Sequence, residues 1–245
     1  MSVLLQKSAS GVATVTINRP QALNALDIPA KERLADIWQE IADDASVRVA
    51  VLTGAGEKAF CAGSDIKEIS RTGKMVSTET LMRAIPNVGD VLPKPVIGAL
   101  HGYCVGFGMT LALHCDLRLA AKNTLLGYPE VRHGMISGVS AIRLPQVIPA
   151  ARALEMMLLA RNIAADEAMR FGLLNAVVDD VQAEAQTWAE TIASYSPVAV
   201  QATKRLALFP QRLSEAEQRE IAAVRDLVES KDDYKQGAAA FTKRA

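Results

Sequence analysis

The sequence has few aromatic residues, no net charge and no long apolar run. Phe, Trp and Tyr make up 4% of its 245 residues, so a core must be built mainly from Ala, Val, Leu and Ile. Lys and Arg together number 27, as do Asp and Glu, so the chain has no long-range attraction to nucleic acid or an anionic membrane. No run of about 18 consecutive apolar residues exists, so no membrane span is expected.

Cysteine is also scarce, with Cys61, Cys104 and Cys115 the only examples. An odd number without C-x-x-C spacing argues against a disulfide framework or a cysteine zinc site. The H-E-x-x-H spacing of a zinc enzyme is missing as well, so we expect no bound metal. The N-terminus lacks the basic and long apolar regions of a signal peptide, which favours a cytoplasmic location.

Half of the residues are hydrophobic, and their spacing predicts an α/β core followed by a helical C-terminal third. Strands are expected over residues 3–7, 12–17, 47–53, 96–100, 116–120 and 124–127. Helices are expected over 29–43 and 76–92, and after the turn at 102–108 as far as about 114. From about Gly138 the pattern is almost wholly helical, and Ser214-Glu-Ala-Glu217 forms a capping box before a long helix.

Two glycine-bearing segments, residues 61–65 and 102–108, are the first candidates for a functional site. Each segment alone is typical of a tight turn. Together they indicate more, because each follows a predicted buried strand and precedes a helix. Helix N-termini present unpaired N–H groups and a positive dipole end, which suit a developing anion. We therefore expect the two segments to form one anion-stabilising pocket.

Several motifs in a consistent order resemble the crotonase (enoyl-CoA hydratase/isomerase) family over nearly the full chain. They are Asn18-Arg-Pro20 with Asn24-Ala-Leu26, residues 59–68, residues 94–108 continuing to Cys115-Asp116, Gly127-Tyr-Pro-Glu130, residues 168–174 and Phe241-Thr-Lys-Arg244. The resemblance implies a crotonase-like α/β spiral of ββα units with a helical C-terminal trimerisation region. It implies a core over residues 1–190 and a helical region over 191–245 in one catalytic unit, assembled as a homotrimer or a dimer of trimers.

The resemblance also implies an acyl-CoA thioester as the ligand, with no permanently bound cofactor. The thioester oxygen is expected to meet the backbone N–H groups of Ser64 and Phe107. Phe107 stands where many family members have glycine, but its N–H group is retained. The expected substrate-binding residues are Ala25, Ala62, Asp65, Ile66, Lys67, Gly106, Thr110, Tyr128, His133 and Lys243.

Catalytic carboxylates are the point at which this sequence departs from the family. Family hydratases commonly use two glutamates to activate one water molecule, and the second aligns with Glu130. The first would fall at Thr110, whose hydroxyl can hold water but cannot act as a general base. Glu130 is therefore the only recognised acid/base, with His133 as an alternative auxiliary group.

The sequence thus predicts an enzyme of the enoyl-CoA hydratase/isomerase type that stabilises a thioester enolate and isomerises or hydrates an enoyl-CoA. The threonine at position 110 shifts the balance from hydration toward isomerisation. Thioester hydrolysis, decarboxylation and C–C cleavage remain alternatives. A non-catalytic acyl-CoA or RNA binder is a further alternative, although zero net charge argues against RNA.

Overall fold

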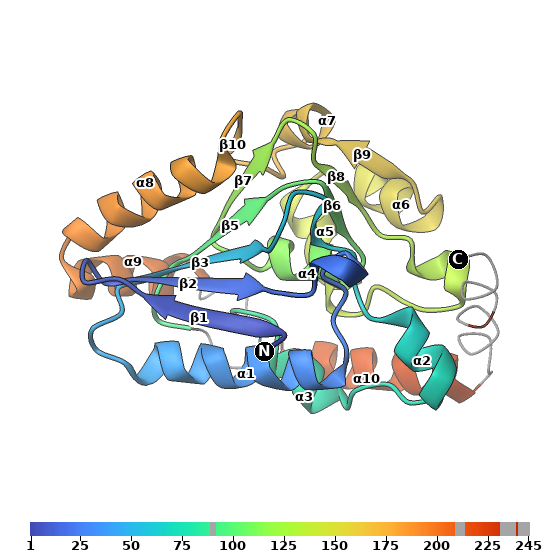
Figure 1. Ribbon diagram of the computed structural model, residues 1–245. Coiled ribbons are helices and arrows are strands. Elements are labelled where there is room, and N and C mark those ends of the chain that lie inside the picture. Colours follow the sequence, from blue (N-terminus) through green and yellow to red (C-terminus); the bar gives the residue numbers. More distant parts are fainter. Residues whose placement is uncertain (89–91, 209–213, 231–238, 240–245) are drawn as a thin grey trace.

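The computed structural model describes residues 1–88, 92–208, 214–230 and 239 (Figure 1). Its larger sheet has six strands: β1 (Val3–Lys7), β2 (Val12–Ile17), β3 (Val49–Gly54), β5 (Val96–Leu100), β7 (Leu117–Ala121) and β10 (Ala176–Val178), in that order. β1 is antiparallel to β2, and the other neighbours are parallel. The strands predicted from hydrophobic patterning are confirmed, with ends shifted by up to two residues.

A second sheet contains β4 (Ala59–Cys61), β6 (Tyr103–Val105), β8 (Leu125–Gly127) and β9 (Asn162–Ala164). The chain alternates between the sheets: β3, β5 and β7 of the larger sheet are followed by β4, β6 and β8 of the smaller one. Helical segments come next, namely α2 (Ile66–Thr72), α4 (Phe107–Leu113), and η2 (Glu130–His133) with α5 (Val139–Val147). This arrangement confirms the expected ββα units.

Helices cover both faces of the larger sheet, with α8 (Val181–Ser194) on one side and α1 (Ile28–Asp43) on the other (Figure 1). Alternate side chains of a strand point to opposite faces, so β3 divides between two apolar clusters. Val49 and Val51 pack with α8, whereas Ala50 and Leu52 pack with α1. A strand buried on both faces is almost continuously apolar, which is why β3 was predictable.

Several short elements differ from the prediction. The helix expected over 76–92 is only α3 (Thr78–Arg83), because Pro86 disfavours helical geometry before it and Asn87 has φ +62°; residues 89–91 lie outside the described part. The turn expected over 102–108 contains β6, and β9 and β10 interrupt the C-terminal third. β6, β9 and β10 have three residues each, too few to show periodicity, so their pairing with neighbouring strands reveals them.

The C-terminal part adds α6 (Ala150–Leu158), α7 (Ala165–Arg170), α9 (Pro197–Leu208) and α10 (Glu215–Ser230). The predicted capping box is confirmed: Ser214 N donates to Glu217 Oε2 at 2.7 Å, and Glu217 N donates to Ser214 Oγ at 3.2 Å. Across the described residues, no helix is long and apolar enough to cross a membrane. The division at residue 190 stays a prediction, and residues 241–244 lie outside the described part.

Candidate active site

Three neighbouring parallel strands of the smaller sheet end at one place. β4, β6 and β8 lie side by side, and their carboxyl ends lead into Gly63-Ser64, Gly106-Phe107 and Pro129-Glu130 respectively. Ligands of α/β sheets usually bind outside the carboxyl ends of parallel strands. Topology therefore brings together the two glycine segments and the candidate acid/base, which are far apart in the sequence.

Gly63 and Gly106 allow these segments to approach closely. Their φ angles are +102° and +57°, in the region that favours glycine. A Cβ atom on Gly63 would lie 3.2 Å from Val105 O and 3.3 Å from Phe107 N. A Cβ on Gly106 would lie 3.6 Å from Gly63 Cα and 3.5 Å from Glu130 Oε1. Side chains at either position would crowd the space between the proposed donors and the carboxyl group.

The backbone around Ser64 and Phe107 leaves their N–H groups unpaired. Leu26 N donates to Gly63 O at 2.8 Å and Asp65 N donates to Leu26 O at 2.9 Å, so the intervening Ser64 N–H is passed over. Phe107 is the first residue of α4, where an N–H group has no partner within the helix. Within the described part of the chain, neither N–H donates to a protein acceptor. Two free donors on adjoining segments can bind one anionic oxygen.

Residues of the N-terminal motif brace the first glycine segment. Arg19 Nη2 lies 2.9 Å from Asp65 Oδ2 and 3.1 Å from Asp27 Oδ2. The buried Asn24 side chain donates to Ala59 O at 2.7 Å. Asp65, expected to bind substrate, caps α2 by accepting from Glu68 N. The motif therefore holds the loop that carries Ser64.

Glu130 occupies a poorly solvated position at the start of η2. Its Oε2 is buried and has no hydrogen-bond partner within the described residues. Burial raises the pKa of Glu130 to about 7, against the opposing effect of hydrogen bonds from its own N–H and the Ser137 side chain. Both protonation states are thus populated near neutral pH, as proton transfer in either direction requires.

Hydroxyl groups surround the position expected for a second carboxylate. Thr110 is buried on α4, and its Oγ1 accepts a hydrogen bond from Ser140 Oγ at 2.9 Å. Tyr128 is fully buried nearby, and burial raises the pKa of its hydroxyl well above the usual value. Thr110 lines the same cavity as Glu130, so one carboxyl group and a hydroxyl group are available to a ligand there.

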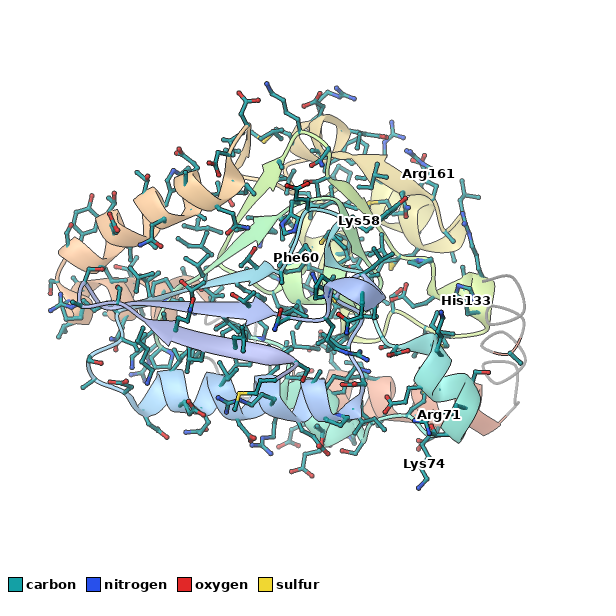
Figure 2. The ribbon with its side chains drawn as sticks, in the orientation of Figure 1. Lys58, Phe60, Arg71, Lys74, His133 and Arg161 are labelled. Atoms are coloured by element: carbon teal, nitrogen blue, oxygen red, sulfur yellow. The ribbon has the colours of Figure 1, made fainter. Side chains whose placement is uncertain are left out.

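The cavity brings together most of the predicted site residues. Its wall includes Ala62, Ser64, Ile66, Gly106, Phe107, Thr110, Glu130 and His133. Figure 2 shows His133 on the side of the molecule where Arg71 and Lys74 lie at the far end of α2. Ala25, Asp65, Lys67 and Tyr128 lie outside the wall formed by the described residues, and Lys243 lies outside the described part of the chain.

The prediction missed much of the wall, including three charged residues, Lys31, Glu68 and Lys74. Apolar side chains from α3, the loops after α2, α3 and η2, and α10 form much of it: Met75, Val76, Leu81, Met82, Ile85, Met135, Ile136 and Ile221. Lys31 of α1 lines it too, with its Nζ 3.0 Å from Ser64 Oγ. Lys31 precedes Leu34 by three residues and Trp38 by seven, so helical spacing could have placed it on the buried face.

Other titratable groups near the centre of the protein stay neutral. Burial raises the pKa of the Cys61 thiol to about 12 and lowers that of His114 to about 3. The three cysteines are free and buried, as expected for packing residues. Among the residues that the structure describes, no three His, Cys, Asp or Glu side chains gather as metal ligands would.

Comparison with known proteins places the chain in a family. The family model described as enoyl-CoA hydratase/isomerase matches residues 7–245. An (E)-benzylidenesuccinyl-CoA hydratase from Thauera aromatica is 42% identical over 217 residues, covering 85% of this chain and 83% of its own. A short-chain-enoyl-CoA hydratase from Clostridium acetobutylicum is 38% identical over 209 residues, covering 83% and 80%. The crystal structure of a carnitinyl-CoA hydratase from Mycobacterium avium has a TM-score of 0.87 at 32% identity, covering 99% and 96%.

Proposed function

Because the chain belongs to the enoyl-CoA hydratase/isomerase family, we propose that it catalyses the reversible addition of water to an enoyl thioester of coenzyme A. The observation that carries this proposal is the Glu130 carboxyl group, whose Oε2 is buried, beside two unpaired backbone N–H groups in one cavity. Relatives whose names describe hydratases of CoA thioesters support water as the second substrate.

The two N–H groups supply electrostatic stabilisation. In this proposal Ser64 N–H and Phe107 N–H donate to the thioester oxygen, which gains negative charge as the enolate forms. Fixed donors in a cavity with a mainly apolar wall cost little reorganisation, so they favour the enolate over the ground state. Removing one such donor typically lowers kcat by about 10²–10³-fold.

Glu130 supplies the proton transfers. Its carboxylate takes a proton from water as the water oxygen bonds to C3, and the C2–C3 π electrons move toward the thioester oxygen as the enolate. The resulting carboxylic acid returns the proton to C2, and the carbonyl is restored. A pKa of about 7 allows Glu130 to act first as base and then as acid with small energetic cost at either step.

Double-bond isomerisation is a second candidate, favoured by Thr110 in the place of another carboxylate. Glu130 alone can take a proton from C2 of a 3-enoyl thioester and return it to C4, with no water involved. Thr110 then has no chemical role, whereas in hydration its hydroxyl, held by Ser140, would position the water. The two candidates therefore differ in what they require of Thr110.

The test is to incubate the purified protein with short 2-enoyl, 3-enoyl and 3-hydroxyacyl thioesters of CoA and identify the products by mass spectrometry. Hydration predicts interconversion of the 2-enoyl and 3-hydroxyacyl forms, and about tenfold slower turnover in Thr110→Val than in Thr110→Ser. Conversion of the 3-enoyl form alone, equally fast in both variants, would establish isomerisation instead. Release of free CoA as the main product would contradict both.

Assembly and location also remain proposals. We propose a homotrimer or a dimer of trimers, supported by exposed apolar side chains on α6 and α9, such as Leu158 and Leu206. Light scattering on the purified protein gives the subunit number, and a monomer would contradict the proposal. The free buried cysteines support a reducing, cytoplasmic location, which fractionation of the source cells would test.

A further inference from the structure

Lys31 is a charged side chain in a position where charge is costly. It lies in the first turn of α1 and is 4% exposed. Removing an ammonium group from water costs several kcal/mol unless it gains partners, so buried lysines are rare. Neither the family motifs nor the proposed proton transfers use Lys31, so its burial in the wall of the active-site cavity needs its own explanation.

Lys31 contacts the side chains of both proposed oxyanion donors. Its Nζ donates to Ser64 Oγ at 3.0 Å and lies 5.3 Å from the centroid of the Phe107 ring, within the range of a cation–π contact. Ser64 follows β4 and Phe107 begins α4, and the described hydrogen bonds do not link the two residues directly. A single cation on a third element therefore bridges them.

The helix that carries Lys31 is well anchored at this end. Asp27 caps α1 by accepting from Ala30 N at 2.9 Å, and its carboxylate also lies 3.1 Å from Arg19 Nη2. Leu26 pairs with the Ser64 segment through two backbone hydrogen bonds. Lys31 thus extends from a fixed base, as a residue that holds others in place must do.

The charge of Lys31 acts on its surroundings as well as its contacts. It favours the thiolate of Cys61, although burial outweighs this effect and raises the pKa of that thiol. The same field reaches the space beside the Ser64 and Phe107 N–H groups, where the wall is mainly apolar and charges are weakly screened. A negative charge developing there is stabilised by a cation nearby.

We infer that Lys31 is a positioning residue of the oxyanion site. It holds Ser64 and Phe107 in place relative to each other and adds positive potential at the thioester oxygen. This inference rests on the proposed function, because it assumes that the oxygen binds between those two N–H groups. Phe107, which replaces the glycine common at this position, then has a role of its own: its ring is the surface over which the cation lies.

The test uses a chromophoric thioester, 4-(dimethylamino)cinnamoyl-CoA, whose absorption moves to longer wavelength when its carbonyl is polarised. The wild-type protein should bind it with a red shift. Lys31→Met should bind it with a smaller red shift, and should lower kcat by about tenfold to a hundredfold, as expected for loss of a charged hydrogen bond, with a much smaller change in KM. Lys31→Arg should recover part of both, because it keeps the charge.

Two further variants keep the inference testable if Lys31→Met folds poorly. Ser64→Ala retains the N–H donor and removes the hydroxyl that accepts from Lys31, so it should also reduce the red shift. Lys58→Met, at an exposed lysine before β4 (Figure 2), is the matched control and should behave like wild type. A wild-type protein that gives no red shift contradicts the proposed function. Either of two results contradicts the role of Lys31 and leaves the proposed function standing. One is a full red shift with unchanged kcat in Lys31→Met, and the other is a full red shift in Ser64→Ala.

Discussion

Strands of the larger sheet have five or six residues, apart from the short β10, whereas every strand of the smaller sheet has three. The larger sheet is covered on both faces by helices and contributes more residues to the apolar core than the smaller sheet does. The smaller sheet buries less but ends in the glycine turns and in Glu130. The long strands thus form the more deeply buried sheet, and the short strands place polar groups at their carboxyl ends, where the hydrogen-bond ladder stops and N–H groups become free.

The two regions also differ in what they contribute to stability. Side chains such as Leu52 and Ile97 of the larger sheet are fully buried and apolar, so their burial favours folding. At the smaller sheet, an acid with a pKa raised to about 7 opposes folding when it ionises. We therefore expect substitutions in the two regions to separate catalysis from stability.

The largest effect is expected from Glu130→Gln, which removes the proposed acid/base and keeps the shape of the side chain. Turnover of every active thioester should fall by about 10²–10⁴-fold, the usual contribution of a general acid–base group. Steady-state kinetics measures this, with the exposed Glu57→Gln as the matched control. Unchanged turnover in Glu130→Gln would show that another group moves the proton.

The pH dependence of the wild-type protein and of Glu130→Gln provides an independent check. In the proposed function the ionised Glu130 is the base, so wild-type kcat/KM should rise with pH through about 7. The pKa of Glu130 in the folded protein lies above its ordinary value of 4.5, so ionisation of Glu130 destabilises the folded state. This loss of stability is present above pH 7 and absent below about pH 4.5. Glu130→Gln should therefore be more stable than wild type at pH 8 by roughly 3 kcal/mol, at 1.36 kcal/mol per pKa unit, with the difference lost in acid.

The next largest effect is expected from Phe107→Pro, which deletes one backbone donor. Proline is tolerated at the first position of a helix, so α4 should still form. We expect kcat to fall by about 10²–10³-fold. Phe107→Ala keeps the N–H group and should lose much less, so equal losses in the two variants would assign the effect to the ring instead.

The smallest effect on turnover is expected in the larger sheet. Leu52→Ala in β3 and Leu126→Ala in β8 make the same change at two sites with 0% exposure. Each should lower the free energy of unfolding by about 2–5 kcal/mol in chemical denaturation. Only Leu126→Ala should also lower kcat, because β8 leads to Glu130. Loss of kcat in folded Leu52→Ala would mean that the two regions are more tightly coupled than their packing indicates.

The larger sheet was also easier to predict from the sequence than the smaller sheet. Long, doubly buried strands such as β3 have an apolar run that identifies them, and helix α1 has a clear amphipathic face. The glycine segments were found because each combines a preceding strand with a following helix. Strands β4, β6, β9 and β10 were missed, since three residues carry little pattern and their hydrogen bonds are made with segments distant in the sequence.

Lys31 shows the limit most clearly. A lysine in the first turn of a helix is typical of a solvated surface, and its sequence neighbours do not indicate a partner across 33 positions. The spacing of Lys31 to Leu34 and Trp38 indicates that it lies on the apolar face of the helix. A charged residue on that face points to a role only when the residues that it faces are known.

By itself, the sequence determined the α/β class, the order of the segments around the site and the carboxyl group proposed as acid/base, because hydrophobic period, glycine and carboxyl groups are local properties. Only the tertiary structure decided that Ser64 and Phe107 have free N–H groups, that Glu130 is poorly solvated, and that a lysine lies beside both donors. Free donors, desolvation and through-space charge depend on which distant segments come together, and that is a property of packing.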